Sequence, residues 1–186
     1  MSGPAKRLAP ASSPAYEGRL DVFLRPGQYF VGDHRHEIRT VLGSCVSITL
    51  WHPRLRIGAM SHFLLSHNST RHASQVLDAR YGEGALRLML RELRRWDVNP
   101  AECGAKIFGG GNMFPEQHKG AAAIDIGRRN GEAARTLLQA QGIAILSESL
   151  FGEGHRQIVF DVANGDVWSR QLKPVCPAAM AGEVTA

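Results

Sequence analysis

Two residues whose side chains can carry out nucleophilic chemistry, Cys45 and His62, lie on neighbouring apolar runs of the sequence. The runs Val46 to Trp51 and Ile57 to Leu65 are rich in β-branched and large apolar residues, which is typical of β-strands. Between them lies the polar stretch His52-Pro53-Arg54-Leu55, which indicates a turn. A hairpin of this kind can bring a thiol nucleophile next to an imidazole, whose ordinary pKa near 6.5 suits proton transfer at neutral pH.

The turn sets the expected register of this hairpin. Its proline cannot supply the positive φ of the tightest two-residue turn, so we expect a four-residue loop in which Trp51 pairs with Arg56. In an antiparallel ladder the paired residue numbers sum to a constant, which places Cys45 opposite His62. Directly opposed residues carry Cβ atoms roughly 4.5 to 5.5 Å apart on one face. A slip of one residue would send His62 to the other face.

The residues before the cysteine favour the catalytic interpretation. Gly43 lets the backbone turn sharply ahead of Cys45, which leaves neighbouring amide N–H groups free at a strand entrance. Such groups can form an oxyanion pocket, and Ser44 is therefore a candidate substrate-binding residue. The alternative is that a lone cysteine is simply a small buried hydrophobe, and this is how we interpret Cys103 and Cys176.

The composition limits the classes of function. A chain of 186 residues is one ordinary domain, and its formal net charge of +5 fits an acidic protein partner or weak attraction to nucleic acid without specifying either. Three cysteines without CxxC spacing argue against a disulfide scaffold, a zinc knuckle or a thioredoxin-type pair, so a reducing cytosol fits best. No signal-peptide h-region and no run near the roughly 20 apolar residues of a membrane span is present.

Periodicity predicts an α+β fold. Apolar residues recur at helical spacing from Glu83 to Trp96, and a second helix is expected from Arg129 to Gln141. Strands outnumber helices without strict alternation, so we expect a layered sandwich of mixed or antiparallel sheet with two main helices. Residues 1–19 are expected to be a flexible tail, 20–172 the domain and 173–186 a loosely held tail. The strands are expected within 20–31, on either side of a Pro-Gly break, and at 37–42, 46–51, 57–65, 105–108, 143–150, 157–162 and 166–172.

Three further features are weaker signals. The first helix carries an arginine face, which is either simply solvated or a docking surface for an acidic partner. The glycine run that contains Gly110, Gly111 and Asn112 is either a tight turn or a wall of the substrate cleft, and these three residues are candidate substrate-binding residues. The run does not fit the phosphate-loop patterns, and the scattered histidines lack metal-binding spacing, so neither a nucleotide nor a metal is expected.

Four blocks of sequence together resemble the chemoreceptor glutamine deamidase family, CheD: GSCVSITLWHP, IGAMSHFLL, AKIFGGGNMF and IGRRN. The resemblance extends roughly from Leu20 to Leu172. It implies a layered α+β fold shared with some bacterial toxin deamidases. It also implies a cytoplasmic hydrolase that converts particular glutamines of chemotaxis receptors to glutamates, and this chemistry needs no cofactor.

The resemblance also assigns site residues and partners. The family's nucleophilic cysteine falls on Cys45 and its histidine on His62. Its catalytic threonine falls on Arg39, one position before Thr40, so Thr40 becomes the candidate orienting residue with the register out by one. The implied partners are the cytoplasmic regions of methyl-accepting chemotaxis receptors and a CheC-like phosphatase that binds some members. No nucleic acid partner is expected, and the membrane is approached only through the receptors.

Two rival functions fit the same residues. A different thiol amidohydrolase or a transglutaminase-like acyl transferase would use the same thioester and differ in the acceptor that reaches it. A non-catalytic module that binds receptors or a signalling partner through the arginine face would not need the thiol at all.

Overall fold

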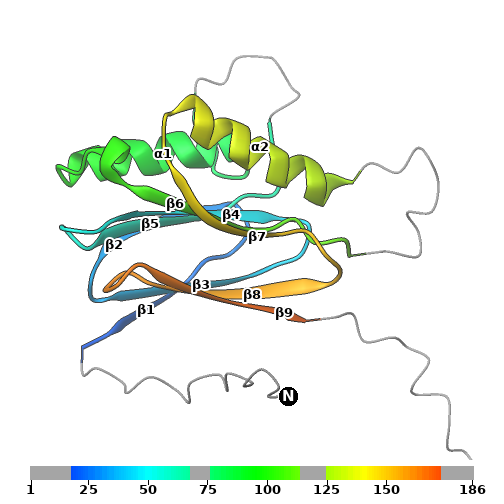
Figure 1. The fold of residues 1–186 in the computed structure, drawn as a ribbon, viewed down its shortest axis with the longest axis horizontal. Coiled ribbons are helices and arrows are strands. Elements are labelled where there is room, and N and C mark those ends of the chain that lie inside the picture. Colours follow the sequence, from blue (N-terminus) through cyan, green and yellow to red (C-terminus); the bar gives the residue numbers. More distant parts are fainter. Residues whose placement is uncertain (1–17, 68–75, 114–124, 173–186) are drawn as a thin grey trace, which may run out of the picture.

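The protein folds into three layers, as the computed structural model shows for residues 18–67, 76–113 and 125–172 (Figure 1). Two helices, α1 (Gly82–Arg95) and α2 (Ile126–Ala140), cover one face of a five-stranded sheet, and a four-stranded sheet packs on its other face. The predicted α+β sandwich with two main helices is therefore confirmed. The remaining elements are β1 (Leu20–Phe23), β2 (Gln28–Asp33), β3 (His36–Leu42), β4 (Val46–His52), β5 (Ile57–His62), η1 (Pro100–Glu102), β6 (Gly104–Gly109), β7 (Ile145–Leu150), β8 (His155–Asp161) and β9 (Asp166–Leu172).

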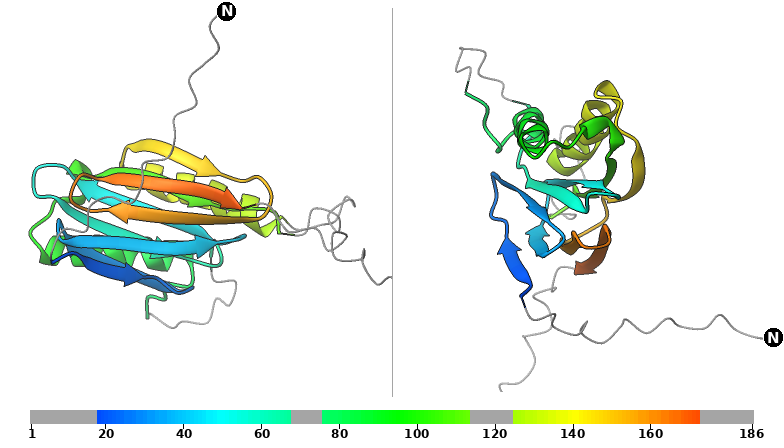
Figure 2. Two further views of the ribbon diagram at one scale, coloured as in Figure 1. Left: turned by 90° about the horizontal axis from the view of Figure 1, so that it is seen from below. Right: turned by 90° about the vertical axis from the view of Figure 1, so that its left-hand side faces the viewer.

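Both sheets are mixed. The five-stranded sheet has the order β2-β5-β4-β6-β7, and all its pairs are antiparallel except β6 with β7. The four-stranded sheet has the order β1-β3-β8-β9, and only β1 with β3 is parallel. Figure 2 shows the outer face of this second sheet, which no helix of the described residues covers.

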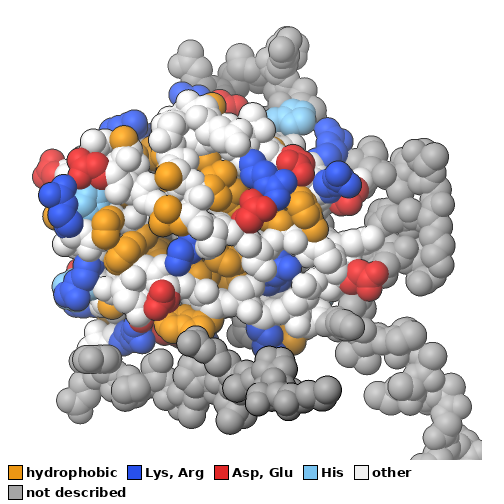
Figure 3. Space-filling model, viewed as in Figure 1, with side chains coloured by type: hydrophobic (Ala, Val, Ile, Leu, Met, Phe, Trp, Pro, Cys, Tyr) orange, Lys and Arg blue, Asp and Glu red, His pale blue; other side chains and the backbone are white. Residues whose placement is uncertain are grey.

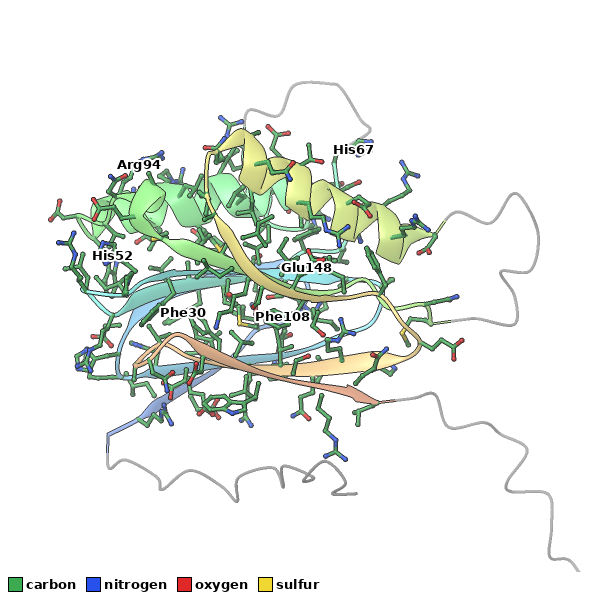
Figure 4. The ribbon with its side chains drawn as sticks, viewed as in Figure 1. Phe30, His52, His67, Arg94, Phe108 and Glu148 are labelled. Atoms are coloured by element: carbon green, nitrogen blue, oxygen red, sulfur yellow. The ribbon has the colours of Figure 1, made fainter. Side chains whose placement is uncertain are left out.

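The sandwich has two apolar cores because side chains of a strand alternate between faces. On β4, Val46, Ile48 and Leu50 point toward the helices. Trp51 of the same strand and Cys45, which directly precedes the strand, pack in the core between the sheets. Figure 4 labels Phe30 and Phe108, which also belong to this inter-sheet core. A side chain on the face of β4 or β5 that points toward the four-stranded sheet can therefore contact residues of both sheets.

The helices match the periodicity with shifted ends. Leu86, Met89 and Leu93 are buried as predicted, but Trp96 is exposed because the helix ends before it. Helix α2 begins three residues earlier than predicted, since the Asp125 carboxylate caps it by accepting a hydrogen bond from the Arg128 N–H at 2.8 Å. The arginines of α1 lie on its exposed face, and Figure 4 shows Arg94 pointing away from the sheets.

The predicted hairpin register is wrong by two residues. The loop has four residues, as expected, but it starts one residue later, so that His52 pairs with Ile57 and Trp51 with Gly58. The His52 side chain explains the difference, because its Nδ1 accepts a hydrogen bond from the Leu55 N–H at 3.2 Å. The His52 carbonyl also accepts one from the Arg56 N–H at 2.9 Å, which closes the turn.

The ends of the domain and its surface add little to the site. Arg19, placed in the expected N-terminal tail, forms ion pairs with Glu37 and Asp161, whereas residues 1–17 and 173–186 lie outside the described part of the chain. Acidic and basic side chains are interspersed on the face shown in Figure 3. Neither α1 nor α2 is long and apolar enough to cross a membrane.

Candidate active site

The site is built where the two sheets meet, around a hydrogen bond between Thr40 and His62. Thr40 lies on β3 of the four-stranded sheet and His62 at the end of β5 of the five-stranded sheet, and both are almost fully buried. The Thr40 Oγ1 lies 2.8 Å from His62 Nδ1 and 2.7 Å from the Leu24 carbonyl oxygen. The structure thus brings the candidate orienting residue and the candidate base together, although 22 positions separate them in the chain.

This arrangement fixes the tautomer of His62. A threonine hydroxyl has one proton, and the Leu24 carbonyl can only accept, so the Thr40 hydroxyl donates to Leu24. Its oxygen must then accept from Nδ1–H of His62. The proton-free nitrogen of the ring is therefore Nε2, which is buried and has no hydrogen-bond partner among the described residues. An unpaired Nε2 with the opposite ring nitrogen anchored is the arrangement a general base requires.

Burial keeps His62 neutral. It lowers the pKa of His62 to about 4, because the charged imidazolium is poorly solvated between the sheets, and the nearby Leu24 carbonyl offsets only part of this shift. The imidazole is therefore uncharged near neutral pH.

Cys45 lies on the same face of the sheet as His62, but not directly opposite it as predicted. Val46 forms an isolated antiparallel bridge with Phe63, so Cys45 falls opposite residue 64 instead of opposite His62. The error of two residues preserves the face, which makes Cys45 and His62 diagonal neighbours with Cβ atoms roughly 7 Å apart. Burial raises the pKa of the Cys45 thiol, and the N–H of Cys45 itself, close to the sulfur, offsets part of this. Sγ forms no hydrogen bond with His62 in the described structure.

The backbone ahead of the thiol is held at three successive carbonyls. The Gly111 N–H donates to the Gly43 carbonyl, and the Gly110 N–H donates to the Cys45 carbonyl, both at 2.8 Å. The Ser44 carbonyl between them accepts a hydrogen bond from the Asn130 side chain at 3.1 Å. For the N–H groups of Ser44 and Cys45, by contrast, no backbone acceptor is found within the part of the chain that the structure describes.

The glycine run packs directly behind the cysteine. At Gly109, which has a φ of 112°, a Cβ atom would lie 2.3 Å from the Cys45 carbonyl oxygen, and at Gly110 one would lie 2.7 Å from the Gly127 carbonyl oxygen. Only glycine permits this approach. The Asn112 N–H donates to the Gly152 carbonyl at 2.7 Å. Contact of Gly110, Gly111 and Asn112 with substrate stays a prediction, since the N–H groups of all three are used within the protein.

Two site residues were missed by the sequence analysis. Asn130 lies in line with the buried residues Ala134 and Leu138 on α2, and a polar residue at this spacing is the signal that could have revealed it. Arg156 lies at an inward position of β8, on the same face as the buried Ile158. Its guanidinium donates to the carbonyls of the β6 and β7 ends that flank the glycine run.

Other features of the described residues do not add chemistry here. A cavity of about 240 Å³ at the start of α2 includes Asn130 but neither Cys45 nor His62. Within residues 18–67, 76–113 and 125–172, no group of three His, Cys, Asp or Glu side chains is placed to hold a metal ion. Cys103 is buried on the helix side of the sheet, and its pKa is raised to about 11 by burial.

Comparison with known proteins identifies the family. A family model described as CheD chemotactic sensory transduction matches residues 64–171. The chain is 62% identical over 156 residues to a "probable chemoreceptor glutamine deamidase CheD 2" of Albidiferax ferrireducens, covering 84% of this chain and 90% of that one. It is 41% identical over 167 residues to a "probable chemoreceptor glutamine deamidase CheD 1" of Chromobacterium violaceum, covering 90% and 86% of the two chains. A "probable chemoreceptor glutamine deamidase CheD" of Pseudomonas syringae is 36% identical over 81% of this chain and 89% of its own.

The matched family region begins two residues after His62, so it identifies the chain independently of the candidate catalytic residues. The relatives extend the likeness over most of the chain. On both grounds, the chain belongs to the CheD family.

Proposed function

We propose that this protein is a chemoreceptor glutamine deamidase, which hydrolyses the side-chain amides of particular receptor glutamines to glutamates and ammonia. The observation that carries the proposal is the Thr40–His62 hydrogen bond, which leaves Nε2 of a neutral His62 unpaired on the face that bears Cys45. The names of the CheD relatives support the same substrate class.

The reaction runs through a thioester. Nε2 of His62 takes the Cys45 thiol proton as Sγ attacks the amide carbon, and backbone N–H groups at Ser44 and Cys45 stabilise the oxyanion. The imidazolium then gives its proton to the amide nitrogen, the C–N bond breaks and ammonia leaves. Water, deprotonated by His62, attacks the thioester carbon, and Cys45 leaves with the proton from the imidazolium, which yields glutamate.

The proposal places the protein in the cytoplasm, where it meets the cytoplasmic regions of methyl-accepting chemotaxis receptors. Binding of a CheC-like phosphatase stays a prediction from the family resemblance. No cofactor or metal enters the proposed chemistry.

An assay with a purified receptor cytoplasmic fragment tests the function. We expect wild-type protein to release ammonia and to shift specific receptor peptides by the mass of one amide-to-acid change. Cys45→Ala should abolish both signals, whereas Cys103→Ala, which removes a thiol outside the site, should retain them. Activity that survives in Cys45→Ala, or a wild type that leaves a verified native receptor set unchanged, would refute the mechanism.

The same assay separates the rival functions. Incorporation of an added primary amine in place of water would identify acyl transfer. A cellular chemotaxis phenotype that Cys45→Ala leaves intact would favour a non-catalytic binding module.

A further inference from the structure

Asn130 occupies an unusual position for an asparagine within a helix. It is 1% exposed, and it lies one turn from Ala134 and two from Leu138 on the face of α2 that packs on the five-stranded sheet. A buried side-chain amide is costly unless its donors are satisfied. Its Nδ2 group has two protons, and both are used.

The two hydrogen bonds of Asn130 join the segments that carry the nucleophile and the base. Nδ2 donates to the Ser44 carbonyl at 3.1 Å, one residue before Cys45, and to the Leu64 carbonyl at 2.7 Å, two residues after His62. Because Cys45 falls opposite Leu64 in the register set by the Val46–Phe63 bridge, Asn130 spans both strands at the level of the thiol.

The bond to Ser44 determines where the next N–H points. No described peptide bond is cis, and in a planar trans peptide the C=O and the following N–H point in opposite directions. Asn130 draws the Ser44 carbonyl toward the helix layer, so the Cys45 N–H points toward the layer between the sheets. The Cys45 side chain packs in that layer, and His62 meets Thr40 there.

We propose that Asn130 is a positioning residue for catalysis, which holds the Ser44–Cys45 peptide so that the Cys45 N–H donates to the oxyanion of the tetrahedral intermediate. This inference rests on the proposed deamidase function and adds a residue to its site. A side chain between the Ser44 and Leu64 carbonyls has to donate two hydrogen bonds, and the asparagine amide donates both from one nitrogen. An aspartate of equal size would present oxygens to both carbonyls and donate to neither.

The alternative is that Asn130 merely attaches α2 to the sheet. The two roles differ in which reaction of the thiol they affect. Attack on an amide develops an oxyanion, whereas alkylation by iodoacetamide displaces iodide and develops none, so only the amide reaction depends on the Cys45 N–H. Leu138→Ala supplies a matched control. Leu138 is fully buried on the same face of α2, and its apolar side chain cannot form a hydrogen bond to the Ser44 carbonyl.

The experiment compares wild type, Asn130→Ala, Asn130→Asp and Leu138→Ala in full-length protein. For each we would measure kcat and KM with the receptor fragment, the rate of Cys45 alkylation at the same pH, and the thermal unfolding midpoint. A receptor peptide with an aldehyde in place of the glutamine amide serves as an analogue of the tetrahedral intermediate.

For both Asn130 variants we expect kcat to fall by about 100-fold, as for loss of one oxyanion donor, while KM and the alkylation rate change by less than about threefold. Affinity for the aldehyde should fall in parallel with kcat/KM. Leu138→Ala should lower the unfolding midpoint and leave the ratio of deamidation to alkylation unchanged.

Three results would overturn the inference: an unchanged kcat in the Asn130 variants, an equal loss of deamidation and alkylation, or failure of both variants to fold, which would assign Asn130 to attachment of the helix. A wild type without deamidase activity would instead refute the proposed function itself. The wild-type arm of the experiment therefore separates the two failures.

Discussion

At the scale of single residues, the Thr40 hydroxyl determines which nitrogen of His62 can act as a base. Its proton goes to the Leu24 carbonyl, so its oxygen holds the Nδ1–H of the ring. In a Ser-His-Asp triad a carboxylate does this, and it also stabilises the imidazolium that forms. A neutral hydroxyl orients the ring without that charge, which is consistent with the low pKa of about 4 for His62.

Replacement of Thr40 by valine tests this orienting role. The valine has nearly the same shape but removes both hydrogen bonds of the Thr40 hydroxyl in a buried site. Such a loss is worth about 1–3 kcal/mol, so kcat should fall by about 10- to 100-fold with little change in KM. Steady-state deamidation of the receptor fragment measures this. Thr40→Ser keeps the hydroxyl and should keep most of the activity, and a Thr40→Val enzyme with wild-type kcat would contradict the assignment.

The pKa shifts at the site predict an unusual pH dependence. Burial lowers the pKa of His62 to about 4 and raises that of Cys45, so the resting pair is a neutral thiol and a neutral imidazole. In the proposed mechanism, His62 acts as a base only when its imidazole is unprotonated. Lowering its pKa therefore extends activity toward acid, and kcat/KM should rise as pH increases through about 4 and stay level near neutrality.

The thiol gives an independent measurement of the same prediction. The rate of alkylation by iodoacetamide should keep rising with pH above the ordinary pKa of a cysteine, because the raised pKa of Cys45 shifts thiolate formation to higher pH. A thiolate already present at pH 6, seen by its ultraviolet absorbance, would show instead that a thiolate–imidazolium pair exists at rest.

At the scale of elements, sequence periodicity predicted the helices and strands well because local patterns fix them. The hairpin register failed because it depends on His52, whose side chain accepts the Leu55 N–H and lies 3.3 Å from the Glu102 carboxylate, a contact between residues 50 positions apart. The error was an even number of residues. Since side chains alternate between faces at every residue, an even error leaves Cys45 and His62 on one face. The two side chains are therefore neighbours, although they are not directly opposed.

The packing of the elements also explains which contacts of the candidate site could not be predicted from the sequence. Thr40 could be placed near the cysteine in the chain, but its contact with His62 depends on how β3 of one sheet lies over β5 of the other. Asn130 and Arg156 act on carbonyls of residues that are distant in sequence or lie around a turn. Periodicity marks both as polar residues at inward positions, but only the packing of layers shows what they bind.

At the scale of the whole molecule, polar contacts join the two sheets at both ends of the inter-sheet core. At one end, Trp51 Nε1 donates to the Val162 carbonyl at 2.9 Å and Lys106 Nζ donates to the Gly165 carbonyl at 2.8 Å. At the other end lie Thr40 with His62 and the guanidinium of Arg156. The candidate site therefore forms only when the two sheets are in register with one another, which makes global stability a condition of activity.

Arg156 provides the sharpest test of this coupling. It reaches from β8 to the Gly109, Ser149 and Phe151 carbonyls and to the Gln171 side chain, and it is 5% exposed. Methionine fills similar space but leaves these acceptors unpaired, and although it relieves the cost of burying a cation, we expect a net loss of about 3 kcal/mol in the free energy of unfolding.

Urea unfolding of Arg156→Met measures that loss, and Arg170→Met is the matched control, because Arg170 lies exposed on the neighbouring strand β9. The control should change stability by no more than about 0.5 kcal/mol, as is usual for a surface substitution. A similarly small effect at Arg156 would mean that the carbonyls around the glycine run find water as an alternative partner. Apolar packing and the Thr40–His62 contact would then be what stabilises the end of the sandwich that contains the candidate site.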